Sequence, residues 1–166
     1  MSSAPTPPYV GLPADDVLQL LRAEERELDF PSFTLEDAWQ VGTWLRHESL
    51  VRGHSVAVSI VLGGQRAFHA ATPGSAALND AWLARKFRVV EHFGHSTLTV
   101  RYTYEANGAD FAADSLLDPR EYAAAGGAFP IRIGGTLAGA VGVSGLEMHE
   151  DHALVVEALR VHRVLS

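Results

Sequence analysis

The chain has 166 residues, of which 47% are hydrophobic and 20% are charged, a composition typical of one globular domain and not of a disordered segment. Its formal net charge of −7 argues against a general nucleic-acid binder, because the neutralisation of phosphates requires a basic surface. The absence of cysteine excludes disulfides, thiolate nucleophiles and cysteine-ligated zinc. Because no run is long enough to span a bilayer and the start lacks a secretory-signal pattern, we expect a cytoplasmic protein that contacts neither membrane nor nucleic acid.

Apolar periodicity predicts a series of helices and strands after a proline-rich start. Residues 1–13 contain four of the eight prolines, so we expect a flexible N-terminal arm before a single domain over 14–166. In chain order, the predicted elements are a helix over 14–27, a helix from Thr34 to about Arg52, strands over 55–62 and 65–71, a helix from Ser75 to about Phe93, a segment over 96–107, strands over 129–133 and 137–144, and a helix over 147–165.

Two glycine pairs determine the predicted fold class. Gly63-Gly64 and Gly134-Gly135 each join two strand-forming runs, which is a strong hairpin signal. We therefore expect an antiparallel sheet of four to five strands covered by helices, which is an α+β fold. In the helix that follows Thr34, the spacing places Leu35, Ala38, Trp39, Gly42 and Leu45, together with Leu50 as a further candidate, on the buried face.

Lys86 is the one lysine among thirteen basic Lys and Arg residues. In such an arginine-rich chain, a retained lysine could mark a position where a compact ammonium fits and a planar guanidinium does not. The alternative is a surface lysine retained by chance.

Several motifs are shared with a known family. They are Trp82-x-x-x-Lys86, Gly94-x-Ser96, Gly126-Gly127-x-Phe129-Pro130, Val143-Ser144-Gly145 and Glu150-Asp151-His152. Together they make the chain resemble the GlcG/HbpS-like "haem-degrading domain" family, in its functionally uncharacterised branch, over about residues 30–162. The resemblance implies a profilin-like fold with a central antiparallel sheet, homo-oligomers from dimers to larger rings, and haem or iron binding in some members.

The segment 96–107 is ambiguous when its residues are considered alone. Its β-branched and aromatic residues favour a strand by propensity. The resemblance implies a helix that begins at Ser96, and we predict a helix on that basis.

The motif residues suggest a ligand pocket near a subunit boundary. Lys86 and Arg132 could together bind a carboxylate or phosphate, Arg132 through its bidentate fork. The alternative for Arg132 is an ion pair with an acidic neighbour across an oligomer interface. Ser96, Ser144 and His152 complete the predicted ligand-binding set. Ser144 is not predicted to be a hydrolase nucleophile, because its surroundings lack the G-x-S-x-G elbow.

A polar cluster at the start of the last helix suggests a second kind of site. His149 and His152 lie three residues apart, and with Glu150 or Asp151 they could form a metal site of imidazole and carboxylate ligands. The alternative is that the acidic residues stabilise the helix N-terminus through its dipole. That alternative leaves His152 unexplained, so we predict that its ring is partly buried and either hydrogen-bonded or facing a cavity.

Three hypotheses for the function follow. The first is an oligomeric protein that binds a small ligand or cofactor, with haem as the candidate that the resemblance implies; such haem would be non-covalent, because a chain without cysteine has no CxxCH motif. The second is an enzyme of unknown reaction on a small acidic molecule, with His152 as acid/base. The third is a scaffold that recruits a protein partner without catalysis. The sequence does not select a histidine for haem, and it leaves open whether the protein is an enzyme.

Overall fold

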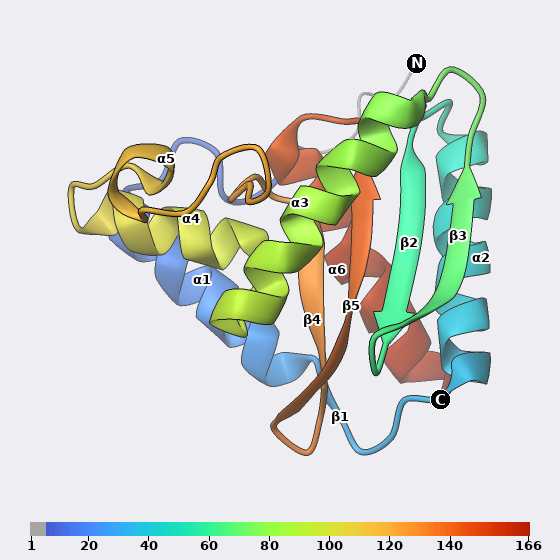
Figure 1. The fold of residues 1–166 in the computed structure, drawn as a ribbon. Helices are drawn as coiled ribbons and strands as arrows, with labels where there is room; N and C mark the ends of the chain where they lie inside the picture. Colours follow the sequence, from blue (N-terminus) through green and yellow to red (C-terminus); the bar gives the residue numbers. More distant parts are fainter. Residues whose placement is uncertain (1–5) are drawn as a thin grey trace.

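A five-stranded sheet forms the centre of the computed structural model, which describes residues 6–166 (Figure 1). The strands are β1 (Asp29–Phe30), β2 (Ala57–Leu62), β3 (Gln65–Ala71), β4 (Ala128–Ile133) and β5 (Thr136–Ser144), in the spatial order β1-β4-β5-β2-β3. Strand β1 runs parallel to β4, and all other neighbours are antiparallel. The predicted α+β class is confirmed. The parallel edge strand β1 was not predicted, because two residues are too few to show a strand pattern.

Six helices surround this sheet. They are α1 (Ala14–Glu27), α2 (Leu35–Val51), α3 (Ala77–Phe93), α4 (Thr97–Ala106), α5 (Phe111–Asp114) and α6 (Met148–Leu165). Helices α2 and α6 cover one face of the sheet and α3 crosses the other, while α1 and α4 stack on each other beside β4 (Figure 1). None of the helices in the described residues combines the length and apolar character needed to cross a membrane.

The main core lies between the sheet and the helices α2 and α6. Alternate residues of the strands point toward it, so Ile60, Phe129 and Val141 from three neighbouring strands are all buried there. Val155 and Leu159 of α6 pack onto them. The apolar face predicted for the last helix is therefore confirmed.

The buried face of α2 agrees with the predicted one at Ala38, Gly42 and Leu45 but not at Leu35 and Trp39. Leu35 and Trp39 are 56% and 58% exposed, so their predicted burial is wrong. The helix turns Gly42 toward β3, where a Cβ would lie 2.4 Å from the Phe68 ring. Because glycine lets this ring lie directly against the helix, Trp39 is left outside the core, edge-on to Phe68 at 5.9 Å between ring centroids.

The starts of α3 and α4 test the predicted helix starts at Ser75 and Ser96. Ser75 does not cap α3, because its hydroxyl donates to the Thr72 carbonyl and the helix begins after Ala76. Ser96 does cap α4, with its Oγ accepting the Thr99 N–H at 3.1 Å, so the predicted helix is confirmed. Leu98 packs onto α1, and this tertiary contact outweighs the strand propensity of the segment.

Tyr9 attaches the described part of the predicted arm to the domain. Its side chain is buried among Leu21 of α1 and Leu98 of α4, so a flexible arm does not describe this residue. Residues 1–5, the remainder of the predicted arm, lie outside the described residues.

Candidate functional site

Motif residues that are far apart in the sequence meet at one end of the sheet. Strand β5 ends at Ser144, Gly145 makes the turn, and α6 begins three residues later. Helix α3 brings Lys86 to this place, and the loop at Gly126-Gly127 passes through it before β4. The site is therefore assembled from a helix, a loop and a strand-to-helix turn.

The ammonium group of Lys86 lies at the centre of this site. Its side chain is only 3% exposed, and Nζ donates to the carbonyl oxygens of Gly126 at 2.8 Å and Val143 at 3.1 Å and to Oδ2 of Asp151 at 3.1 Å. These three contacts use all three N–H donors of the ammonium. The hypothesis of a position that fits a compact ammonium therefore has a structural basis, and a surface lysine retained by chance does not describe Lys86.

Asp151 connects this ammonium to the Ser144 turn. Its Oδ1 accepts the Leu146 N–H at 3.0 Å, and its Oδ2 accepts the Gly145 N–H at 3.4 Å. Burial raises the pKa of Asp151 to about 6, although Lys86 and the backbone donors oppose this rise. Burial likewise lowers the pKa of Lys86 against the opposing effect of Asp151. For both groups, burial is the largest cause of the pKa shift, ahead of the attraction between the two charges.

Two glycines allow the loop to approach the ion pair closely. Gly127 has a φ of +132°, and a Cβ there would lie 2.4 Å from the Val143 carbonyl oxygen and 2.6 Å from Nζ of Lys86. At Gly126, a Cβ would lie 2.2 Å from the carbonyl oxygen of Met148. The Gly-Gly motif is thus explained by the space that the ammonium and the start of α6 occupy.

A pocket of about 360 Å³ opens above the ion pair; we call it the Ser144 pocket. Its walls are largely apolar and include Leu78 and Trp82 of α3 and Met148 of α6, while Ser144 and Asp151 supply polar groups. Trp82 is half-buried, with the Arg85 guanidinium over its ring, so it is a wall of the pocket and not the core residue that its helical spacing suggests. Apolar walls with a few polar groups are typical of small-molecule sites.

The structure separates the five residues predicted to share one ligand site. Lys86 and Ser144 belong to the Ser144 pocket. Ser96 and Arg132 instead meet at Glu25 of α1: the Ser96 N–H donates to Oε1 at 2.8 Å, and the Arg132 guanidinium donates to Oε2 at 3.2 Å. No property of Glu25 in the sequence distinguished it from the other charged residues of its helix.

His152 lies apart from both the Ser144 pocket and Glu25, on the inner face of α6. Its side chain is 1% exposed, neither ring nitrogen has a hydrogen-bond partner in the described residues, and its Nε2 lies 3.6 Å from Oε1 of Glu24. The Tyr9 hydroxyl donates to the same carboxylate at 2.8 Å. His152 is thus buried more fully than predicted, but its ring is not hydrogen-bonded and does not line the Ser144 pocket.

The proposed metal ligands also have other contacts. His149 bonds to the Tyr102 hydroxyl through Nε2 and to Glu147 through Nδ1, both at 2.8 Å. Glu150 accepts the Glu147 N–H in the capping box of α6, which fits the helix-start explanation. Within residues 6–166, no three His, Asp or Glu side chains gather as a metal site would require, so the geometry gives no support to a metal at His149, Glu150 and His152.

Comparison with known proteins gives the family. Residues 33–160 match the family described as "Haem degrading protein HbpS-like". The chain belongs to this HbpS-like family. It is 48% identical to a UPF0303 protein of Streptomyces coelicolor, with 96% of each chain covered.

Two solved structures resemble this HbpS-like chain. The structure of the Ybr137w protein has a TM-score of 0.82 and 30% identity, covering 90% of this chain and 89% of that one. A structure described as a PduOC:Heme complex has a TM-score of 0.65 and 20% identity, covering 78% of this chain and 94% of that one, and at this identity it shows the fold alone.

Proposed function

We propose that this HbpS-like protein binds a small organic ligand in the Ser144 pocket. The observation that carries the proposal is that the separate motif residues Lys86, Gly127, Ser144 and Asp151 converge beneath one pocket of ligand size. The turn is held in place before any ligand arrives, because Asp151 already accepts the backbone N–H groups that follow Ser144.

The chemistry of the walls indicates the class of ligand. The Trp82 ring and the Met148 side chain favour an apolar or aromatic body, and the Ser144 hydroxyl can donate to or accept from one polar group. An anionic group is disfavoured here, because the Asp151 carboxylate borders the pocket and the donors of Lys86 are all in use. We therefore infer a neutral or cationic ligand.

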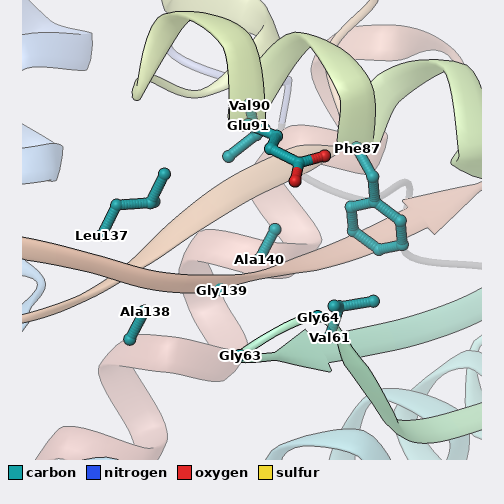
Figure 2. A pocket seen from close by; sticks show the side chains of 10 residues that line it. All are labelled: Val61, Gly63, Gly64, Phe87, Val90, Glu91, Leu137, Ala138, Gly139 and Ala140. Atoms are coloured by element: carbon teal, nitrogen blue, oxygen red, sulfur yellow. The ribbon is translucent and has the colours of Figure 1, made fainter.

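Haem, which the family description suggests, does not fit this pocket as an iron-ligated cofactor. Its lining contains no histidine, cysteine or tyrosine, and a methionine such as Met148 ligates haem iron together with a histidine. A groove of about 390 Å³ between α3 and β5 has apolar walls from Phe87, Val90 and Leu137 but likewise no such ligand (Figure 2). A third pocket, described below, contains His95 but is lined by charged groups. None of these three pockets joins a histidine, cysteine or tyrosine to apolar walls.

The enzymatic alternative receives little support from the placement of its acid/base. His152 is enclosed by Tyr9 and Phe129, with ring centroids at 5.2 and 5.8 Å, and is not in contact with the Ser144 pocket. A general acid or base must come within hydrogen-bond reach of its substrate. Ligand binding is therefore the function that this geometry supports best.

Native mass spectrometry of the purified full chain tests the proposal, since it reports a retained small molecule and the assembly size together. We expect a non-covalent adduct that Trp82→Ala loses and that Trp39→Ala retains, because Trp39 is an exposed tryptophan of α2 away from the pocket. Haem titration of the same variants is the second measurement. A Soret band that Trp82→Ala leaves unchanged, with no other adduct in the wild type, would favour haem at another site over the proposed ligand.

A further inference from the structure

A second pocket of about 540 Å³ lies at the opposite end of the β4–β5 hairpin from Ser144; we call it the arginine pocket. It is formed where α1 ends, where α4 begins and where the hairpin turns. Its lining residues are Arg22, Glu25, Arg26, Asp29, His95, Arg132 and Gly135. Apart from the glycine, all of these residues carry a charged or titratable side chain, so the arginine pocket differs in chemistry from the Ser144 pocket.

The two carboxylates of the arginine pocket are already engaged by the protein. Glu25 is buried and accepts from the Ser96 N–H, His95 Nδ1 and the Arg132 guanidinium. Burial alone would raise the pKa of Glu25, but the hydrogen bonds from His95, Ser96 and Thr99 outweigh it and lower that pKa. Asp29 accepts the Gly135 N–H at 3.0 Å. Both carboxylates therefore accept hydrogen bonds from groups of the protein itself.

The arginines retain donors that face the pocket. Arg132 is held in place by Glu25 and the Gly94 carbonyl, yet its side chain is 20% exposed. Arg22 and Arg26 stand one helical turn apart on α1 and are exposed. In the described residues, the ion pairs around this pocket involve Arg132 and His95, whereas Arg22 and Arg26 take part in none. Three guanidinium groups thus surround one hollow in a chain of net charge −7.

We propose that the arginine pocket binds a small dianionic oxyanion, such as a phosphoryl group or a pair of carboxylates on one small molecule. Guanidinium groups match these oxyanions with paired N–H donors. The buried Glu25 holds His95 and Arg132 in place and offsets the charge of Arg132, while Arg22 and Arg26 form no ion pair in the described residues.

This site is independent of the proposed function. The Ser144 pocket disfavours anions, whereas the arginine pocket requires them. Substitution of Trp82 is therefore expected to leave anion binding unchanged, and failure of either proposal does not affect the other.

Isothermal titration calorimetry of the full chain at constant ionic strength tests the inference, with inorganic phosphate and succinate as separate probes. We expect at least one probe to bind with one-to-one stoichiometry and a Kd below about 1 mM. The double variant Arg22→Gln/Arg26→Gln should weaken that binding at least tenfold. Which probe binds distinguishes a phosphoryl from a dicarboxylate ligand.

The control is Arg46→Gln, which removes an exposed arginine of α2 that does not line the pocket. It should leave the Kd within twofold of the wild-type value. Absence of binding by both probes would overturn the inference. So would a Kd that the double variant leaves unchanged, or that Arg46→Gln weakens as much as the double variant does, because either result would mean that no local site exists.

Discussion

Substitution of Lys86 by methionine is predicted to destabilise the fold in a pH-dependent way. Lys86→Met keeps the length of the side chain but leaves the buried carboxylate of Asp151 without its cation, together with two carbonyl groups. Breaking a buried ion pair by removing one partner typically costs about 3–5 kcal/mol. We expect a loss of this size at pH 8, where Asp151 is ionised.

The magnitude at lower pH follows from the titration of Asp151. In the wild type its pKa is raised from 3.8 to about 6, which at about 1.4 kcal/mol per pKa unit corresponds to about 3 kcal/mol. A carboxyl whose folded pKa is raised adds stability below its unfolded pKa and loses it as the pH rises through the folded value. In Lys86→Met the opposing effect of the ammonium is gone, so the folded pKa rises further. At pH 5 the variant therefore holds a neutral carboxyl, and we expect its loss of stability to fall to about 1–2 kcal/mol, the scale of the lost hydrogen bonds.

Urea unfolding of wild type and variant at pH 5 and pH 8 measures both losses. The double variant Lys86→Met/Asp151→Leu is the matched control, since a buried pair replaced by apolar residues of similar volume is often neutral in stability. It should recover most of the loss at pH 8 and show little difference between the two pH values. Equal losses of Lys86→Met at both pH values, or a double variant that loses the sum of the single effects, would refute the reasoning.

Three further predictions concern other parts of the molecule. Tyr9→Phe removes the hydroxyl that donates to the buried Glu24 carboxylate, and we expect urea unfolding to show a loss of about 1–3 kcal/mol, whereas an unchanged midpoint would mean that Tyr9 contributes by packing alone. Gly127→Ala places a Cβ 2.4 Å from the Val143 carbonyl oxygen, so the melting temperature should fall by several degrees, and a variant as stable as the wild type would contradict the close approach described for this loop. Because β3 is an edge strand that can pair with another chain, we expect at least a dimer, and sedimentation of only a 17.9 kDa species at micromolar concentration would contradict this.

The hairpins and most helices could be predicted because local residues determine them. Gly-Gly between two β-branched runs sets a hairpin turn whatever lies around it. The helix after Ser96 could not be predicted from propensity, because its stability comes from Leu98 and other residues that pack on α1. The exposure of Trp39 could not be predicted either, since it depends on the Phe68 ring that lies against Gly42. In both cases a contact between distant segments decides the outcome.

The sequence predicted individual residues of the candidate site, but not which of them lie together. Arg132 lies beside the β4–β5 turn, whereas Ser144 ends β5 at its far end, seven residues beyond the partner of Arg132 in the sheet register. At about 3.3 Å per residue this separation is about 23 Å, too far for one small ligand. The predicted hairpin alone therefore contained the information that these two residues serve different pockets. The role of Glu25 was not available from the sequence, because it arises from the packing of α1 against α4.

The buried pair of Lys86 and Asp151 is better explained by the pocket that it shapes than by the stability of the fold. An apolar pair of the same volume could fill the same space, but it would leave the N–H groups of Gly145 and Leu146 without an acceptor. The turn after Ser144 would then lose the contacts that hold it in the conformation that lines the Ser144 pocket. It follows that Lys86→Met/Asp151→Leu should separate two properties that a purely structural ion pair would keep together. The variant should be more stable at pH 8 than Lys86→Met, because no unpaired charge remains buried, and yet it should lose the adduct that we expect native mass spectrometry to detect in the wild-type protein.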